Sequence, residues 1–343
     1  MSTVTIAPMG DEGLNRTWDG LHIALDRPTG ASVVVRRRTS AGELEFLLLH
    51  RNAEGHEYEG DWAWTSPAGC RQPGEPVYPA ALRELAEEAG LTGLRPWAVD
   101  LSWDLPSGTS WVVFAVDVTA DVQIDLVDPE HDRYEWLSAA EARRRVRPEF
   151  VAARQIDRLE RIPTVEMSFR RMTHDDLPDV VRWQRAPHVR EWWFNAVTTP
   201  EAAAERYGPR IDGEVPTRMW VVGIDGRDVG YLQDYPLTED DEYAAKTGHP
   251  EAVAFDYLIG EPDLVGQGLG TRMIWEFLRG VLVADYPDAP TFLASPSHRN
   301  AVSLRALAKC GFTQGTWIDV PSGPAGESVT EIVCTLDRRH WFG

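Results

Sequence analysis

Glu84, Glu87 and Glu88 are three carboxylates at positions i, i+3 and i+4, between Pro79 and Gly90. Proline is well suited to the start of a helix, and glycine closes one by adopting the left-handed conformation. The segment is therefore predicted to be a helix with its three carboxylates on one face. Carboxylates this close repel one another unless a cation lies among them, and their hard oxygens suit Mg²⁺ or Mn²⁺. Such an ion orients and activates water and neutralises a pyrophosphate. The alternative is a solvated acidic helix face.

These glutamates belong to a longer pattern, GCRQPGEPVYPAALRELAEEAGL, which runs from Gly69 to Leu91. The pattern resembles the complete Nudix box of nucleoside-diphosphate-X hydrolases, with no substitution at a defining position. The resemblance implies a Mg²⁺ or Mn²⁺ site made by Glu84, Glu87 and Glu88, with Glu87 also essential to hydrolysis. One mild departure precedes the box, where Ala68 replaces the first of the two usual glycines.

The flanks of this helix support the same family. Residues 33–35 and 46–49 are short apolar runs that predict buried strands. Downstream, residues 129–137 resemble the Glu-His…Trp segment of diadenosine tetraphosphate hydrolases. In that segment the glutamate lies near the metals, so Glu130 is the candidate catalytic base or additional ligand. The alternative for this segment is a strand edge with Trp136 in the core.

Length and charge limit the possible functions. A chain of 343 residues predicts two domains, and a formal charge of −20 disfavours nucleic acid as a partner but suits a cationic substrate. Three widely spaced cysteines without a CxxC pattern are typical of a reducing, cytoplasmic compartment. The amino-terminal segment has no signal-peptide pattern, and no apolar run approaches the ~20 residues that span a bilayer. We expect no membrane partner.

A break in the helical pattern at residues 162–164 separates the two predicted domains. Residues 139–161 are expected to be helical and to complete the first domain, and a new strand is expected from Glu166 to Arg170. The predicted limits are therefore residues 1–162 for the first domain and 165–343 for the second.

The second half contains a strand, a glycine loop and a helix in succession. Residues 253–259 alternate as in a strand, and residues 272–283 have helical spacing of apolar side chains. Between them, backbone N–H groups at a helix amino terminus can bind phosphate where no side chain blocks them. The alternative is an ordinary turn. The candidate ligand-binding residues of this loop are Val265, Gly266, Gln267, Gly268, Leu269, Gly270 and Thr271.

Residues 300–312, NAVSLRALAKCGF, resemble the Asn…Lys-x-Gly-Phe segment of GNAT acyltransferases. The resemblance implies that the glycine loop holds the pyrophosphate of acetyl-CoA, with Asn300 beside the cofactor. Within the superfamily, residues 166–320 are most similar to aminoglycoside 6′-N-acetyltransferases. An apolar residue such as Val265 at the first loop position also fits that group.

Acetylation of a protonated amine requires a carboxylate that removes its proton before attack on the thioester. Asp256, just before the glycine loop, is the candidate base, and its alternative is a structural hydrogen bond at a strand end. Siderophore-type lysine acyltransferases tend to carry His at this position, which favours an amine over a hydroxylamine acceptor. Asp241 matches a second acidic position of the family, and Asp240 and Glu242 flank it. Together they are expected to hold a polycation, and the alternative is an ordinary acidic surface loop. The remaining candidate acceptor contacts are Trp192, Trp193 and Gln233, with core packing as the alternative for at least one tryptophan.

Two departures from the GNAT pattern affect the acceptor and the proton donor. Leu307 occupies the place of the Tyr that protonates the leaving thiolate in many GNAT enzymes, so water or another side chain must supply that proton. Ser295 replaces an acidic residue that often contacts the antibiotic, so another amine remains open as the acceptor.

The predicted fold is α/β (α+β): a Nudix α/β/α sandwich followed by a GNAT acyl-CoA N-acyltransferase fold. Three functions remain open. The first is a bifunctional enzyme that hydrolyses a nucleoside pyrophosphate and acetylates an amine. An aminoglycoside 6′-amine is one candidate acceptor, and its acetylation would give a role in aminoglycoside resistance. The second is an acetyltransferase whose Nudix domain binds nucleotide or dimerises. The third is a ligand sensor without catalysis. A homodimer is compatible with each.

Overall fold

The computed structural model describes residues 16–17, 20–104, 110–239, 242–321 and 328–343. The chain divides into two compact units. The first comprises Met1–Pro96, Asp100–Asp157 and His340–Gly343, and the second comprises Trp97–Val99 and Arg158–Arg339. The domain limits expected from the sequence stay a prediction. No helix in the described ranges combines the length and apolar character needed to cross a bilayer.

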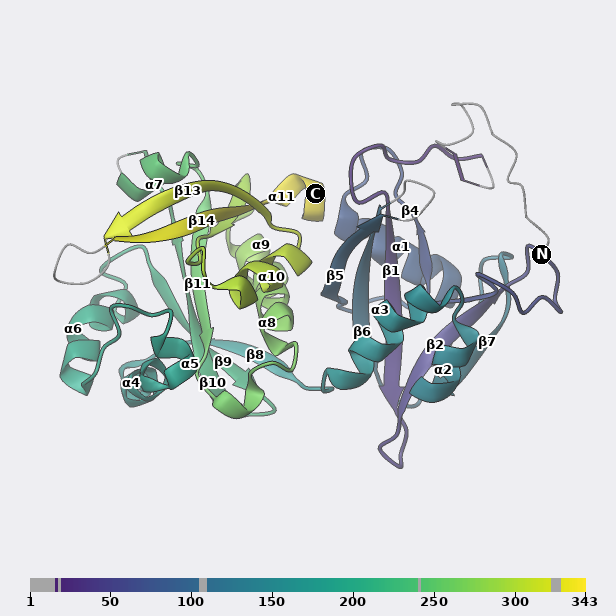
Figure 1. The fold of residues 1–343 in the computed structure, drawn as a ribbon, viewed down its shortest axis with the longest axis horizontal. Helices are drawn as coiled ribbons and strands as arrows, with labels where there is room; N and C mark the ends of the chain where they lie inside the picture. The colour runs from purple at the N-terminus through teal and green to yellow at the C-terminus, as the bar shows by residue number, and fades with distance from the viewer. Residues whose placement is uncertain (1–15, 18–19, 105–109, 240–241, 322–327) are drawn as a thin grey trace. The chain divides into compact units, whose positions relative to one another are not determined.

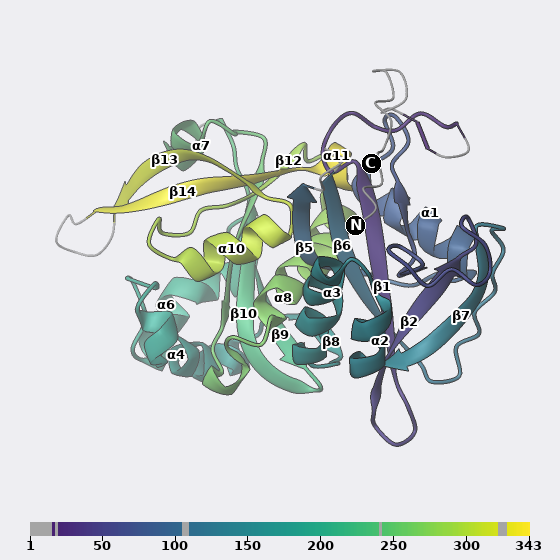
Figure 2. The same cartoon turned by 45° about the vertical axis from the view of Figure 1, so that its right-hand side comes forward.

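The first unit is built on a mixed sheet of seven strands within the described residues, with the core order β3-β2-β1-β6-β5. β4 also pairs with β1, β7 also pairs with β2, and the β1–β6 pair is parallel. The long apolar runs of β1 and β2 are buried because helices cover both faces of this sheet, α1 on one and α3 on the other (Figures 1 and 2). The strands are β1 Gly30–Arg38, β2 Leu44–Arg51, β3 Trp64–Thr65, β4 Ala68–Cys70, β5 Trp97–Asp104, β6 Ser110–Val118 and β7 His131–Ser138.

Helix α1 (Val77–Ala89) begins two residues before the proline that was expected to start it. Pro76 is the N-cap, so Pro79 falls in the first turn, where its missing N–H costs no intrahelical bond. Gly90 ends the helix in the left-handed conformation with φ 66°, as expected. Its N–H binds the Ala86 carbonyl, and the next N–H reaches back to Leu85.

The helical region expected over residues 139–161 is two helices. α2 (Ala139–Arg145) starts with a capping box between Ser138 and Glu141, and α3 (Glu149–Arg161) follows. Pro148 lies between them, and a proline both lacks an N–H and disfavours the helical conformation of the residue before it. The interruption therefore follows from the sequence around Pro148.

The second unit is a seven-stranded sheet within the described residues, ordered β13-β14-β12-β11-β10-β9-β8. All neighbouring strands are antiparallel except β11 and β12, which are parallel. The strands are β8 Met167–Arg171, β9 Arg218–Ile224, β10 Arg227–Pro236, β11 Val253–Ile259, β12 Thr291–Ala294, β13 Thr313–Pro321 and β14 Ser328–Asp337. The strand predicted over residues 253–259 has those bounds.

The connecting helices include a π-helical turn, η3, which splits the single helix expected over residues 272–283. The helical elements are η1 His174–Asp176, α4 Leu177–Arg185, α5 Pro187–Arg190, α6 Pro200–Ile211, α7 Glu242–Thr247, η2 Pro262–Leu264, α8 Leu269–Phe277, η3 Leu278–Leu282, α9 Val283–Asp285, α10 Ala301–Lys309 and α11 Arg338–Phe342.

Alternation along the strands assigns different helices to the two faces of this sheet. On one face Tyr231 of β10 packs against Trp183 of α4 and Tyr207 of α6. Leu232, the next residue along β10, lies opposite Trp220 of β9, and Trp220 packs against Phe277 of α8 on the other face. Consecutive β11 residues therefore point toward different helices.

Strands β11 and β12 pair only at Val253↔Phe292 and Ala254↔Leu293. Beyond Ala254, β11 continues to Ile259 while β12 ends at Ala294. The sheet is consequently open on this side of β11, directly before the glycine loop.

Candidate functional site

Helix α1 distributes its three glutamates between the interior and the surface. Glu84 and Glu88, one turn apart, are only 7 % and 5 % exposed. The Glu87 side chain is 52 % exposed, and its carboxylate pairs with Arg83. The three glutamates expected to share one helix face therefore differ in exposure: two are buried and one is exposed.

Arg83 holds the carboxylates of the box together. Its Nη1 donates to Glu84 Oε1 at 2.7 Å and to Glu87 Oε2 at 2.9 Å, while its Nε donates to Glu75 Oε1 at 2.8 Å. The sequence pattern contained Arg83 and Glu75, but their direct pairing was not foreseen.

Gly69 and Ala68 position the two buried glutamates. A Cβ on Gly69 would lie 2.1 Å from Glu84 Oε1, so only glycine lets this carboxylate lie against strand β4. The backbone N–H of Ala68 donates to Glu88 Oε2 at 2.9 Å. The departure at Ala68 keeps this contact because a backbone group makes it.

The buried carboxylates have the chemistry of a divalent cation site. Burial raises the pKa of Glu84 to about 7. Burial also raises the pKa of Glu88 well above its usual range, and the charges of Glu84 and Glu130 add to this effect. The raised pKa values show that these carboxyl groups are costly to ionise without a cation. A bound Mg²⁺ or Mn²⁺ would favour their charged forms, so this set of oxygen donors fits either ion. Among the described residues, no three His, Cys, Asp or Glu side chains are gathered closely enough to chelate an ion in their present conformations.

Glu130 lies immediately before β7, and its carboxylate pairs with Arg51 of β2. Its charge reaches Glu88, so the structure brings the separate sequence segments of Glu130 and α1 to one place. The next residue, His131, is 5 % exposed, and burial lowers its pKa to about 4. Trp136, the core residue of the alternative interpretation, is only partly buried, and the Arg37 guanidinium lies 4.1 Å from its ring centre.

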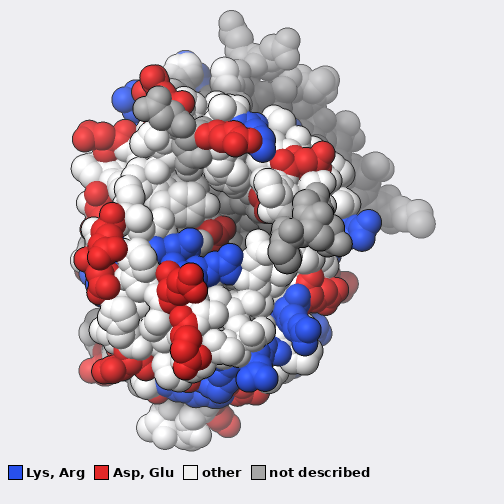
Figure 3. Space-filling model, turned by 90° about the vertical axis from the view of Figure 1, so that its left-hand side faces the viewer, with Lys and Arg blue, Asp and Glu red and all other residues white. Residues whose placement is uncertain are grey.

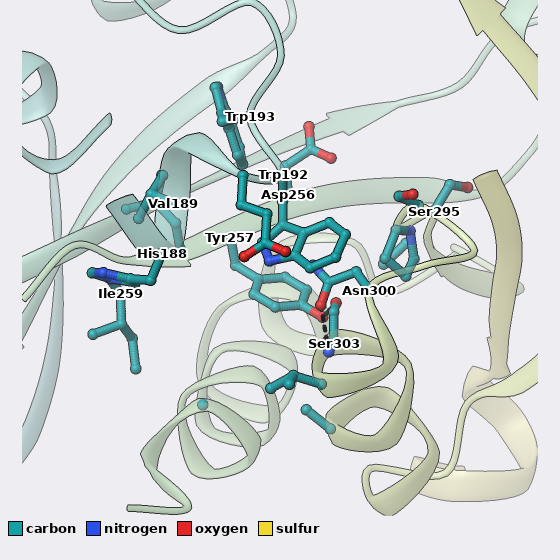
Figure 4. Close-up of a pocket in the computed structure, with 18 of the residues that line it drawn as sticks. His188, Val189, Trp192, Trp193, Asp256, Tyr257, Ile259, Ser295, Asn300 and Ser303 are labelled. Atoms are coloured by element: carbon teal, nitrogen blue, oxygen red, sulfur yellow. Dashed lines mark hydrogen bonds between the residues drawn. The ribbon is translucent and has the colours of Figure 1, made fainter. Parts of the chain in front are cut away.

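The second unit contains a cavity of about 900 Å³ at the opening between β11 and β12 (Figure 4). Its wall includes β11 from Phe255 to Ile259, the segment Ala294–Ser297 after β12, and the start of α10. Most of the predicted ligand-binding residues of this unit line the cavity: Trp192, Trp193, Gln233, Asp256, Val265, Gly266, Gly268, Gly270, Thr271 and Asn300.

Asp256 lies on β11 directly opposite Gln233 of β10. Gln233 Nε2 donates to Asp256 Oδ2 at 2.6 Å, and Gln233 Oε1 in turn accepts from Arg210 of α6. Burial raises the pKa of Asp256, against the opposing effects of the Gln233 amide, the Arg210 charge and the Tyr235 hydroxyl. A raised pKa makes a carboxylate a stronger base, which suits proton removal from an ammonium group.

Tyr257 follows Asp256 on β11 and points toward the other face of the sheet, as strand alternation requires. Its hydroxyl lies 2.5 Å from Ser303 Oγ of α10, and both residues line the cavity (Figure 4). Burial raises the pKa of Tyr257 far above its usual range, so this hydroxyl stays protonated. Leu307, one turn further along α10, is fully buried and offers no proton.

The glycine loop leads directly into α8. Gly266 and Gly268 have φ of 80° and 81°, a conformation that favours glycine, and Gly268 is the N-cap of α8. Within the described part of the chain, the backbone N–H groups of residues 266–268 bind no other group. Gln267 Nε2 donates to the Asp263 carbonyl, and Leu269 is buried. The side chains of Gln267 and Leu269 therefore have structural contacts, and a contact of either residue with a ligand would be made by its backbone.

Asn300 caps α10, since its Oδ1 accepts from the Ser303 N–H at 3.1 Å. Trp193 packs edge-on against Tyr231 with ring centres 5.7 Å apart and also lines the cavity, so its contact with the acceptor stays a prediction. Trp192 also lines the cavity. Asp240 and Asp241 lie outside the described residues. The face drawn in Figure 3 is hollowed near its centre, with both basic and acidic side chains around the hollow.

Glu331 of β14 also lines the cavity and was not foreseen. Burial, together with the charge of Asp256, raises its pKa to about 8. Nothing in the alternating sequence of β14 distinguishes it from an ordinary solvent-facing strand residue.

Two family models match the chain. The NUDIX domain model matches residues 26–159, and the acetyltransferase (GNAT) domain model matches residues 172–320. The chain therefore belongs to the Nudix family in its amino-terminal half, and its carboxy-terminal half matches the acetyltransferase (GNAT) domain.

Curated relatives are found for each half separately. N-hydroxyputrescine acetyltransferase of Acinetobacter baumannii is 28 % identical over 142 residues, which are 41 % of this chain and 66 % of that protein. The asymmetrical bis(5′-nucleosyl)-tetraphosphatase of Sus scrofa is 32 % identical over 108 residues, which are 29 % of this chain and 67 % of that protein. The chain thus spans about two thirds of each relative. Among solved structures, aminoglycoside acetyltransferase AAC(6′)-Ib with coenzyme A matches at 25 % identity and a TM-score of 0.43, covering 51 % of this chain and 96 % of that one.

Proposed function

We propose that the protein is a bifunctional enzyme that hydrolyses a nucleoside diphosphate-linked substrate and transfers an acetyl group from acetyl-CoA to an amine. The observation that carries the acetyltransferase half is that the glycine loop and Asp256 line the same cavity. A phosphate-binding loop and a basic carboxylate on one cavity are the two groups that acetyl transfer requires.

In this proposal the free N–H groups of the glycine loop and the start of α8 bind the pyrophosphate of acetyl-CoA. Asp256 removes a proton from the ammonium group of the acceptor, which frees the nitrogen lone pair to attack the thioester carbonyl. A C–N bond forms, the C–S bond breaks, and the second amine proton passes to the leaving thiolate. The Tyr257 hydroxyl, which stays protonated, donates a hydrogen bond to the charge that develops on sulfur.

Glu84, Glu87 and Glu88 would hold Mg²⁺ or Mn²⁺ in the hydrolase half, with Glu130 as a further ligand or base. The ion supplies charge neutralisation of a pyrophosphate and an acidified water. Arg83 keeps the Glu84 and Glu87 carboxylates aligned, and the Ala68 amide fixes Glu88. The relative from Sus scrofa is named for a dinucleoside tetraphosphate, and this compound class is the first substrate to test.

The acceptor is an amine, with an aminoglycoside 6′-amine among the candidates. The relative from Acinetobacter baumannii is named for N-hydroxyputrescine, a diamine derivative, which makes short-chain amines a second class to test. Asp256 supports an amine because a carboxylate pairs with an ammonium group, whereas a hydroxylamine is largely neutral near pH 7.

The test is a thiol-release assay with acetyl-CoA across a panel of amines, using the wild-type protein and Asp256→Asn. We expect the variant to bind acetyl-CoA normally and to lose about 100-fold or more in kcat, a typical contribution of a general base. Unchanged turnover in the variant contradicts the role of Asp256. A wild-type protein that does not bind acetyl-CoA contradicts the acetyltransferase assignment.

One observation favours a second candidate, an acetyltransferase whose Nudix domain only binds nucleotide or dimerises. Arg83 occupies the Glu84 and Glu87 carboxylates, and within the described residues no ready three-ligand cluster is present. This candidate predicts nucleotide binding without turnover at any Mg²⁺ or Mn²⁺ concentration.

A further inference from the structure

Glu331 lies on β14 beside the segment that follows β12. Its backbone forms an isolated bridge with Ser297, and the next N–H, of Ile332, binds the Pro296 carbonyl at 3.0 Å. These contacts fix the backbone at Glu331 next to the wall formed by Ala294–Ser297, and the Glu331 side chain lines the same cavity as Asp256. The sheet register therefore places two carboxylates on one cavity from two strands that do not pair with each other.

The Glu331 carboxylate makes no hydrogen bond and no ion pair within the described part of the chain. It is nevertheless partly buried, and the group whose charge acts on it is another acid, Asp256. A carboxylate in this position costs free energy unless a cation or hydrogen-bond donors compensate for the lost hydration. Because the cavity is the open side of this carboxylate, a bound ligand is the available source of compensation.

Arg210, the basic residue whose charge acts on Asp256, does not compensate the charge of Glu331. Arg210 binds Gln233 and lies over the ring of Tyr207, with 5.3 Å between the guanidinium carbon and the ring centre. Its charge lowers the pKa of Asp256 but is not among the causes that act on Glu331. Asp256, by contrast, already accepts the Gln233 amide at 2.6 Å. The two carboxylates therefore differ: one is oriented by the protein, and the other has no cationic partner among the described residues.

We infer that Glu331 is a second acceptor-binding carboxylate, which holds one ammonium group of a substrate with at least two amino groups while Asp256 serves the amine that is acetylated. This inference rests on the proposed acetyltransferase function. It also accounts for Ser295, where an acid was expected: the serine hydroxyl is buried without a hydrogen-bond partner among the described residues, and the acidic group lies on the neighbouring strand instead.

Matched acceptors separate this role from a structural one. The probes are 1,4-diaminobutane and kanamycin, which carry several amino groups, and n-butylamine, which carries one. For the wild-type protein, we expect kcat/KM for the better polyamine to exceed that for n-butylamine by about 10-fold or more, because a charge-assisted hydrogen bond contributes ~1.5–3 kcal/mol.

Glu331→Gln keeps the shape of the side chain and removes its charge. We expect KM for the polyamine to rise by about 10-fold or more, with kcat within about 3-fold, while KM for n-butylamine stays within about 3-fold. Glu331→Asp, which retains the charge, should recover part of the polyamine affinity. Acetyl-CoA binding by calorimetry and the thermal unfolding midpoint report whether each variant is folded.

The inference is wrong if Glu331→Gln changes all acceptors alike or none of them, or if the wild-type protein neither binds nor acetylates a polyamine in preference to n-butylamine. In each case normal acetyl-CoA binding and residual transfer to any amine leave the proposed function standing. Absence of acetyl-CoA binding and of transfer to every amine instead removes the proposed function itself.

Discussion

Gln233 and Asp256 face each other across β10 and β11, and the Gln233 side-chain amide donates a 2.6 Å hydrogen bond to Asp256 Oδ2. The bond orients the carboxylate toward the cavity. Arg210 binds the other end of the same glutamine amide, so the Gln233 side chain lies between the guanidinium and the acid. Burial can therefore raise the pKa of Asp256 without a direct ion pair that would cancel the effect.

Removal of this contact should weaken the base without removing it. Gln233→Ala deletes the amide donor, and this loss by itself raises the pKa of Asp256. It also releases Arg210, and a direct ion pair of Arg210 with Asp256 would outweigh that loss and lower the pKa. We expect kcat for amine acetylation to fall by about 10-fold, with a pH–rate profile whose lower limb shifts to lower pH. A variant with an unshifted profile shows that Gln233 does not position the base.

Glu87→Gln and Glu88→Gln test the hydrolase half. Each substitution removes a charge that the proposed cation site uses, so Mg²⁺-dependent cleavage of a dinucleoside tetraphosphate should fall by about 100-fold or more. Chelation of divalent cations should abolish cleavage by the wild-type protein. Acetyl transfer to amines in the same preparations serves as the internal control, because these residues belong to the other unit.

Gly69→Ala tests the close approach of β4 and α1. The added Cβ would lie 2.1 Å from Glu84 Oε1, so the carboxylate must move. We expect a loss of hydrolase activity comparable to Glu84→Gln, even though alanine removes no functional group. Ala68→Gly is the matched control, because the backbone N–H that binds Glu88 is retained.

Glu331 gives the acetyltransferase half a specific pH dependence of stability. Its folded-state pKa of about 8 lies above the unfolded value near 4.5, so between these limits the folded state binds more protons than the unfolded state. The contribution of Glu331 to the free energy of unfolding is therefore lost as pH rises from about 4.5 to about 8.

Glu331→Gln should abolish this loss. At pH 8.5 the variant should be more stable than the wild-type protein by on the order of 1–3 kcal/mol, and at pH 4.5 the two should agree. Thermal unfolding at both pH values without ligand is the measurement. Equal pH dependence of the two proteins contradicts a raised pKa at this residue.

Regular elements and motif residues were predictable from the sequence because periodicity and capping are local. The strand at residues 253–259, the end of α1 at Gly90 and the glycine loop before α8 all agree with local patterns. The break between α2 and α3 differs from the single helical region that the sequence predicts, because the helical pattern continues on both sides of Pro148 while the proline itself ends the hydrogen-bonded run.

The contacts that decide chemistry depend on register between distant segments, which no local pattern encodes. The family resemblance indicates Gln233 as a candidate residue, but its pairing with Asp256 follows from the alignment of β10 with β11. No local sequence pattern identifies Glu331 as a site residue, because its place on the cavity depends on the neighbouring Ser297 and its raised pKa depends in part on the charge of Asp256. Arg83 was visible in the motif, but its bridge to Glu75 depends on how the loop before α1 folds back.

The short pairing of β11 with β12 has a consequence for how a ligand is recognised. Past Ala254, one edge of β11 has no neighbouring strand. Apart from the Ile259 carbonyl, which lies 2.9 Å from His188 Nε2, its peptide groups on that side are open to an extended ligand that carries amides of its own. A ligand bound there would complete the sheet as a substitute strand. Backbone amides of residues 255–259 that face this opening should then exchange with deuterium more slowly when acetyl-CoA is bound, whereas those that already pair with β10 should change little.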